Sequence, residues 1–192
     1  SDLISIVVGF KKEMIMEEHP EVSYIYNDEF GDTNTSKSLL RGLRLTGSDP
    51  VLWLNGDVVF DPAVLEILQP YIDRDQSFVA VNTESVSDEE VKYTLDDRGF
   101  INEISKEVSA GLGEAVGINF VGSSDKPFLT ARLEDCGPQD YFERGIELAI
   151  QRDRRKFRAV DISAARCMEV DFPTDLAQAE TTFADLGSVR KG

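Results

Sequence analysis

Two carboxylates stand where apolar stretches of the sequence end. The run 51–54 leads to Gly56 and Asp57, and the run 167–170 leads to Asp171. Open α/β sheets bind their ligands beyond the carboxyl ends of the strands, and Mg²⁺ takes one or two carboxylates while phosphate oxygens and water fill its other positions. Asp57 and Asp171 are therefore candidate magnesium ligands, and Gly56 would let a ligand approach the backbone closely. For Asp57, the alternative explanation is a carboxylate that only caps a turn.

A second polar stretch leads into a predicted helix. Asn34, Thr35 and Ser36 directly precede leucines at helical spacing over 36–45. The free backbone amides at a helix N-terminus, together with hydroxyl groups, can bind a base edge or a phosphate. The same residues also make an ordinary N-terminal cap, which is the simpler interpretation when nothing else points to a ligand.

Strands and helices alternate along the first part of the chain, as in a doubly wound α/β domain. The spacing of apolar residues predicts strands over 3–8, 22–26, 51–54 and 77–81, and helices over 11–18, 36–45 and from Asp61-Pro62 onward. After these come strands over 91–95, 100–104 and 115–120, a long helix over about 139–152, strands over 157–160 and 168–170, and a helix from about Thr174. We expect one domain over 1–192, with a mixed, mostly parallel central sheet and a small hairpin insertion whose turn is 96–99.

The charge of the chain excludes several classes of partner. Its 20 Lys and Arg residues against 36 Asp and Glu residues give a net charge of −16. Such a surface repels nucleic acid and anionic membranes, and no apolar run approaches a membrane span. With 41% hydrophobic residues the chain is not a disordered one. Two cysteines cannot form a disulfide framework, which favours a reducing, cytoplasmic setting.

Four stretches of the chain carry a resemblance to a known family. They are Asn34-Thr35-Ser36-Lys37-Ser38-Leu39-Leu40, Leu54-Asn55-Gly56-Asp57 with Phe60-Asp61, Ile104-Ser105-Lys106 followed by Gly113-Glu114-Ala115-Val116-Gly117-Ile118, and the segment 169–176 with its Glu-x-Asp-x-x-x-Asp-Leu pattern. In this order and spacing they resemble the sugar-phosphate and phosphocholine nucleotidylyltransferases. The resemblance implies a three-layer, Rossmann-like (GT-A-like) fold.

The resemblance also implies roles for individual residues. Asp57 and Asp171 would bind Mg²⁺ between the nucleotide and acceptor phosphates, and Lys106 would contact the acceptor phosphate. Glu114 would hold the polar or cationic group of the acceptor, or would only pack the end of its strand. The segment 34–36 would lie near the nucleobase or its ribose. If the acceptor is choline-like, Tyr141 could give a cation–π contact.

The beginning of the chain departs from the family pattern. The family opens with a strand, a Gly-rich loop ending in Arg, and a Pro-Lys pair, none of which occurs here. The first strand of this chain resembles the second strand of the family. We therefore expect that the first strand–loop–helix unit, which would cradle the triphosphate, is not part of this chain.

These observations predict Mg²⁺-dependent nucleotidylyl transfer from a nucleoside triphosphate, with CTP favoured, to a phosphocholine-like phosphorylated alcohol or a sugar 1-phosphate, with release of pyrophosphate. The expected partners are thus the triphosphate and a small phosphorylated substrate, and a homodimer is left open. One alternative is a GT-A glycosyltransferase, although the Asp-x-Asp pair usual in such enzymes is missing here. Another is a non-catalytic module of the same fold.

Overall fold

A computed structural model describes residues 4–84 and 90–186 of the chain. Backbone contacts divide it into a first unit, residues 1–51 with 123–155, and a second unit, residues 52–122 with 156–192. None of the helices in the described part of the chain has the length and apolar character needed to span a bilayer.

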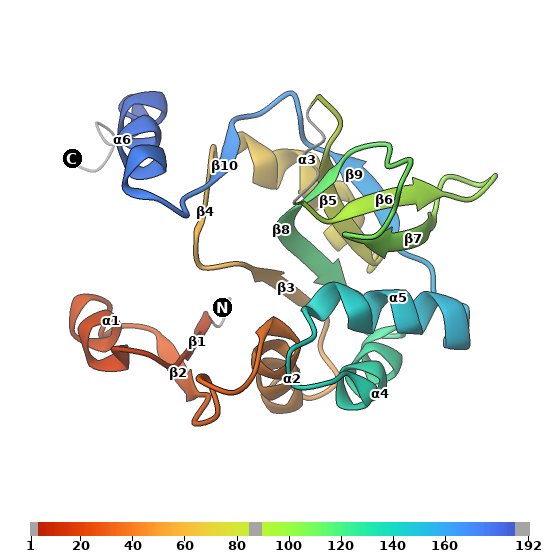
Figure 1. Cartoon of the computed structure of the whole chain (residues 1–192), viewed down its shortest axis with the longest axis horizontal. Helices are drawn as coiled ribbons and strands as arrows, with labels where there is room; N and C mark the ends of the chain where they lie inside the picture. Colours follow the sequence, from red (N-terminus) through yellow and green to blue (C-terminus); the bar gives the residue numbers. More distant parts are fainter. Residues whose placement is uncertain (1–3, 85–89, 187–192) are drawn as a thin grey trace. The chain divides into compact units, whose positions relative to one another are not determined.

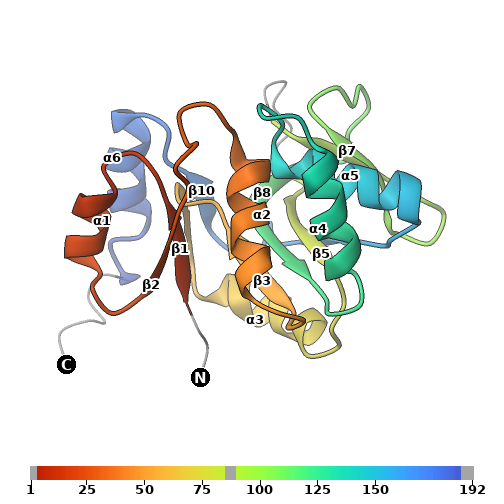
Figure 2. The ribbon, with the colours of Figure 1, turned by 90° about the horizontal axis from the view of Figure 1, so that it is seen from below.

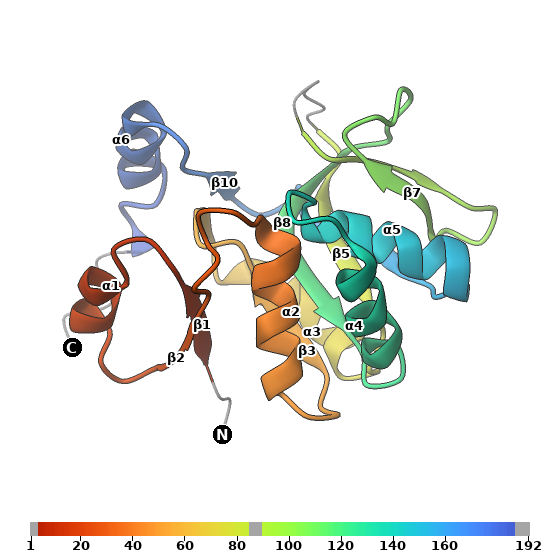
Figure 3. The same cartoon turned by 60° about the horizontal axis from the view of Figure 1, so that its bottom comes forward.

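The first unit contains a small parallel sheet and a group of helices (Figure 1). Its elements are β1 (Ser5–Val8), α1 (Lys12–Glu18), β2 (Ser23–Tyr26), α2 (Thr35–Leu45), α4 (Lys126–Asp135) and α5 (Phe142–Asp153). The strands β1 and β2 pair in parallel, with Ser5 opposite Ser23 and Val8 opposite Tyr26. Helices α2, α4 and α5 pack against one another, as Figure 3 shows.

Leucines and one glycine let these helices approach closely. Helix α2 buries Leu39, Leu40 and Leu43 along one face, because residues three and four apart share a side of a helix. In α5, a Cβ placed on Gly145 would lie 2.6 Å from a methyl carbon of Leu133 on α4. A larger residue at that position would therefore push α4 and α5 apart.

The second unit is built on a mixed sheet. Its strands are β3 (Val51–Leu54), β5 (Phe78–Asn82), β6 (Lys92–Leu95), β7 (Ile101–Ser105), β8 (Glu114–Val121) and β9 (Arg158–Asp161). They follow the order β7-β6-β8-β5-β9, and β3 also pairs with β8. Strands β5 and β9 are parallel, whereas β5–β8, β6–β7 and β6–β8 are antiparallel.

One face of this sheet carries the core of the second unit. Helix α3 (Ala63–Ile72) turns Val64 and Leu68 toward it, and both side chains are fully buried. They pack in one cluster with Phe78 and Ala80 of β5, Ile118 and Phe120 of β8, Val160 of β9, and Ile162, which directly follows β9. Alternate residues of a strand share a face, so this cluster fixes which side of the sheet each strand turns to the helix.

A short antiparallel ribbon lies outside the main sheet. Strand β4 (Val58–Phe60) pairs with β10 (Cys167–Glu169), with Val58 opposite Glu169 and Phe60 opposite Cys167. Helix α6 (Pro173–Thr182) follows β10 after a short turn (Figure 2). The two predicted carboxylates flank this ribbon, since Asp57 directly precedes β4 and Asp171 closely follows β10.

The predicted fold class is confirmed, because the structure is a mixed α/β arrangement with a mixed sheet and a β6–β7 hairpin. Antiparallel pairing is more frequent than expected, since β8 runs antiparallel to both β5 and β6. The helix expected over about 139–152 begins at Phe142. Two further elements, β4 and α4, were not predicted.

Candidate functional site

Asp57 lies in a tight turn that is fastened to the main sheet. The amide of Asn55 donates a 2.9 Å hydrogen bond to the carbonyl oxygen of Gly117 on β8. Gly117 has a φ of +71°, and a Cβ at this position would lie 2.8 Å from the side-chain nitrogen of Asn55. Position 117 therefore requires glycine, both for its positive φ and for the close approach of Asn55. Asp57 itself is exposed, and the space around the Cα of Gly56 is open.

Asp171 is held at the start of α6. Its amide donates to a carboxylate oxygen of Asp175 at 3.1 Å, and the amide of Phe172 donates to the same oxygen at 2.8 Å. Asp175 thus satisfies backbone donors near the N-terminus of the helix, where a negative charge is also favoured. One residue earlier, the amide of Val170 donates to the carbonyl oxygen of Asp57 at 2.9 Å. The segments that carry the two candidate ligands are therefore directly hydrogen-bonded to each other.

Glu169, which was not among the predicted site residues, lies between these two segments. It is the last residue of β10 and is half-buried opposite Val58. Burial is the largest of the causes that raise the pKa of its carboxyl from 4.5 to about 7, and the negative charges of Glu90, Asp57, Asp171 and Glu114 supply the rest of the shift. The structure therefore brings Asp57, Asp171 and Glu114 into one electrostatic environment and adds Glu90 and Glu169 to it. The only sequence signal for Glu169 was its place two residues before Asp171.

The donor set suits a magnesium ion that is bound together with phosphate. In the described ranges, no group of three or more His, Cys, Asp and Glu side chains could hold a metal by itself. The exposed carboxylates of Asp57 and Asp171 offer hard oxygen ligands, and Mg²⁺ commonly takes one or two carboxylates from the protein and the rest from phosphate and water. The residues thus fit a metal whose remaining ligands come from the substrate.

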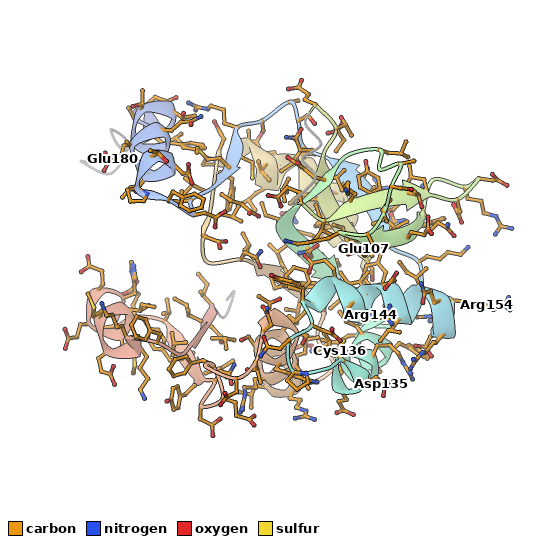
Figure 4. The ribbon with its side chains drawn as sticks, in the orientation of Figure 1. Glu107, Asp135, Cys136, Arg144, Arg154 and Glu180 are labelled. Carbon is orange, nitrogen blue, oxygen red and sulfur yellow. The ribbon has the colours of Figure 1, made fainter. Side chains whose placement is uncertain are left out.

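Lys106 directly follows the hairpin insertion. It is exposed after Ser105, the last residue of β7, and the neighbouring Glu107 is labelled in Figure 4. Ser105 lies opposite Lys92 on β6, and Lys92 lies opposite Glu114 on β8. The hairpin therefore carries Lys106 to the end of the sheet at which Glu114 begins its strand.

A pocket of about 280 Å³ lies within the second unit. It is lined by Asn82, Glu84, Val116, Ile162, Ser163, Ala164, Ala165, Arg166 and Cys167. Val116 lies two residues after Glu114 on β8, and Cys167 lies two residues before Glu169 on β10. Because alternate residues of a strand point to the same side, each carboxylate shares a side of its strand with a lining residue.

Polar groups at the ends of β5 and β9 support the pocket. The hydroxyl of Ser163 donates to the side-chain oxygen of Asn82 at 3.0 Å, and the amide of Thr83 donates to the hydroxyl of Ser163 at 2.9 Å. Burial acts to raise the pKa of Asp161, but hydrogen bonds from Ser163 and Thr83 outweigh it and hold this pKa below its ordinary value. Asp161 is therefore ionised, and it accepts a hydrogen bond from the amide of Ser163, which lines the pocket.

The predicted residues of the first unit gather where α2 and α5 begin. The side chain of Asn34 accepts a 2.7 Å hydrogen bond from the amide of Thr35, and so caps α2. The hydroxyl of Thr35 accepts a 3.1 Å hydrogen bond from the amide of Phe142, next to the half-exposed Tyr141. Ser36 is fully buried. The capping interpretation of Asn34 is thus confirmed, and the structure brings residues 34–36 close to the start of α5.

In the first unit, Lys37 has a structural role. The amine of Lys37 donates to the carbonyl oxygens of Leu133 at 2.9 Å and of Cys136 at 2.5 Å, and so caps the end of α4, where Figure 4 labels Cys136.

Burial raises the pKa of the Cys136 thiol, and burial followed by the charge of Glu169 raises the pKa of the Cys167 thiol to about 11. Both thiols are therefore protonated near neutral pH, which argues against a thiolate nucleophile.

Several solved structures with the same architecture have the names of nucleotide-using transferases. The inositol-1-phosphate CTP transferase from T. maritima matches with a TM-score of 0.71 and 17% identity, over 91% of this chain and 73% of that one. The CTP:phosphocholine cytidylyltransferase LicC from Streptococcus pneumoniae matches with a TM-score of 0.71 and 15% identity, over 94% of this chain and 78% of that one. A UDP-glucose pyrophosphorylase complexed with UDP-glucose matches with a TM-score of 0.69 and 13% identity, over 96% and 81%. At such identities these likenesses show the fold.

The sequence itself also matches a family. No curated protein sequence matches the chain. The model of the family described as Glycosyl transferase family 2 matches residues 11–125, which is more than half of the chain. The chain therefore belongs to Glycosyl transferase family 2, with the GT-A-like fold that the nucleotidylyltransferases share.

Proposed function

We propose that this chain catalyses Mg²⁺-dependent nucleotidylyl transfer from a nucleoside triphosphate, with CTP as the first candidate, to a small phosphorylated alcohol or sugar. The observation that carries the proposal is the backbone link between the segments of Asp57 and Asp171. This link holds the backbone segments that carry the two exposed carboxylates next to each other. The fold shared with cytidylyltransferases supports the same reaction class.

In this reaction an oxygen of the acceptor phosphate attacks the α-phosphorus of the triphosphate, and pyrophosphate leaves. Asp57 and Asp171 would hold the metal, which supplies positive charge to the reacting phosphates. Lys106 would bind the acceptor phosphate, and the N-terminal region of α2 with Asn34 would lie near the nucleotide. Such chemistry depends on positioning and charge neutralisation and requires no protein nucleophile.

The pocket supports a preference for the non-phosphate end of the acceptor. Glu84 lies in its lining, and Glu114 lies two residues before the lining residue Val116 on β8, so negative charge lies near the pocket. The guanidinium of Arg166, which also lines the pocket, already binds Asp61 and Asp185. A cationic group suits this chemistry better than a neutral or negatively charged one does. A phosphorylated amino alcohol of the phosphocholine type is therefore preferred over a sugar 1-phosphate.

A second candidate function is glycosyl transfer from a nucleotide sugar. The family match over residues 11–125 favours it, because members of that family are described as glycosyl transferases. In this case the same carboxylates would hold a metal on the diphosphate of the donor, and no pyrophosphate would form. A non-catalytic module of this fold is the remaining alternative.

One experiment separates these functions. The purified chain is incubated with Mg²⁺ and either CTP plus phosphocholine or a panel of nucleoside-diphosphate sugars, and the products are measured. Pyrophosphate and a nucleoside-diphosphate alcohol in equal amounts support nucleotidylyl transfer. Release of a nucleoside diphosphate from the sugar donors instead supports glycosyl transfer. Binding of nucleotide or metal without any product supports the non-catalytic module.

A further inference from the structure

We propose that Arg166 is a positioning residue that keeps Asp171 in place relative to Asp57, by fastening the end of the β4–β10 ribbon that lies away from the two carboxylates. The inference rests on the proposed function, because it treats these carboxylates as the metal ligands. Arg166 lies directly before β10 and was not singled out by its sequence context.

The guanidinium of Arg166 joins three segments of the second unit. One nitrogen donates to the carbonyl oxygen of Thr182 at 2.5 Å and to Asp185 at 2.9 Å. The other donates to Asp61 at 2.8 Å and to the second oxygen of Asp185 at 2.8 Å. The residue therefore ties together the last turn of α6, the segment just after it, and the start of α3. Only a planar group with several fixed donors can make all of these bonds at once.

The backbone of the same residue closes the ribbon. The amide of Asp61 donates a 2.8 Å hydrogen bond to the carbonyl oxygen of Arg166. At the opposite end, the amide of Val170 donates to the carbonyl oxygen of Asp57. Asp57 and Asp61 flank β4, whereas Arg166 and Val170 flank β10. The ribbon thus has a carboxylate end, with Asp57 and Asp171, and a guanidinium end, with Asp61 and Arg166.

Helix α6 connects these two ends by a second route. It starts beside Asp171, where Asp175 binds the backbone, and it finishes at Thr182, which Arg166 binds. Its apolar packing is limited: Ala179 and the following Phe183 are buried, whereas Phe172 and Leu176 are 68% and 52% exposed. A helix with so little buried surface depends on polar bonds for its placement. Without the guanidinium, the C-terminal end of α6 would lose its hydrogen bond to Arg166. The turn that carries Asp171 would then become more mobile.

The test measures the affinity for the preformed Mn²⁺–CTP complex by titration calorimetry in Arg166→Ala, Arg166→Lys and Asp185→Asn, with the whole chain and no acceptor. We expect the dissociation constant to rise about tenfold in Arg166→Ala, as for other supports of metal ligands, and by less in the two milder variants. The matched control is Arg158→Ala, which also removes a guanidinium bound to backbone carbonyls, those of Arg98 and Gly99, in the same unit. It should lower stability without changing the affinity for the Mn²⁺–CTP complex.

Hydrogen exchange of the amides of Val170, Asp171 and Phe172 gives a readout independent of metal. These amides should exchange faster in Arg166→Ala and keep the parent rates in Arg158→Ala. If Arg166→Ala does not fold, Arg166→Lys and Asp185→Asn, which each keep part of the bonding, take its place. Parent exchange rates in a folded Arg166 variant would overturn the proposal. If the parent chain does not bind the Mn²⁺–CTP complex, the proposed function fails, and the exchange rates still decide the role of Arg166.

Discussion

The amide of Val170 and the carbonyl oxygen of Asp57 are 2.9 Å apart in a backbone hydrogen bond. Backbone atoms, and not the two carboxylates, therefore hold the strand ends together. The side chains of Asp57 and Asp171 are left exposed for a ligand. A substitution of either carboxylate should for this reason change the charge of the site and leave its backbone unchanged.

Asp57→Asn tests whether the negative charge of the site can be removed without a change in its backbone. We expect turnover to fall by at least about a hundredfold, because an amide oxygen supplies no negative charge to a metal bound with phosphate. The free energy of unfolding should stay within about 0.5 kcal/mol of the parent value, as for other surface changes. The measurements are pyrophosphate release and urea unfolding. Asp97→Asn, in the exposed hairpin turn, is the control and should keep full activity; retained activity in Asp57→Asn would remove this residue from the metal site.

Glu169→Gln should change how stability depends on pH. The raised pKa means that between the ordinary value of 4.5 and about 7 the folded chain keeps a proton that the unfolded chain has released. Stability from this group is therefore complete below pH 4.5 and is lost as the pH rises through 7. Glutamine cannot ionise, so the variant should be more stable than the parent by about 1 kcal/mol above that range.

Urea unfolding without divalent cations, at about pH 5 and about pH 8.5, measures this difference. The gap between Glu169→Gln and the parent should open at the higher pH and close at the lower one. Glu103→Gln, an exposed carboxylate on β7, serves as the control and should show no such opening. An equal gap at both pH values would show that the carboxylates do not oppose the ionisation of Glu169.

Asp175→Ala should weaken the start of α6. Removing the carboxylate leaves the amides of Asp171 and Phe172 without their acceptor, at a cost of about 1 kcal/mol. The affinity for the Mn²⁺–CTP complex should fall as well, because the amide of Asp171 loses its hydrogen bond to the carboxylate of residue 175. Asp175→Asn keeps an oxygen acceptor and should recover most of both losses. Calorimetry together with urea unfolding checks this, and a wild-type affinity in Asp175→Ala would contradict it.

Gly117→Ala should displace the turn that carries Asp57. The positive φ is strained for alanine, and the new Cβ would meet the side chain of Asn55. We expect a destabilisation of about 1–3 kcal/mol. Gly31→Ala, where a Cβ meets nothing within 4 Å, is the control and should stay near the parent value in the same unfolding experiment. A stable Gly117→Ala chain would mean that the turn adjusts freely.

Much of the fold follows from local patterns that the sequence shows directly. The strand at Val51–Leu54 has the predicted bounds, and α2 begins within one residue of its predicted start. These elements have apolar residues at a clear period and polar residues that end them. Asp61 lies at the predicted helix start, where its side chain accepts a 2.9 Å hydrogen bond from the amide of Ala63.

The elements that were missed have weak or contradictory patterns. Helix α4 buries Lys126 together with Leu129 and Leu133, so a charged residue occupies its inner face. The amine of Lys126 is satisfied by the hydroxyl of Thr46 at 2.6 Å and the carbonyl oxygen of Asp49 at 2.8 Å, partners far away in the sequence. Strand β4 has three residues, and only its pairing with β10 defines it. Glu169 stands out only through the burial and the charges that tertiary structure brings to it.

The pairing of residues 58–60 with residues 167–169 also has a consequence for the order in which the chain folds. Contacts between segments so distant in the sequence form late, because the intervening chain must first lose its conformational freedom. During synthesis from the N-terminus, Asp57 leaves the ribosome long before its partner strand exists. The affinity for divalent cations should therefore arise only when the last part of the chain has been made.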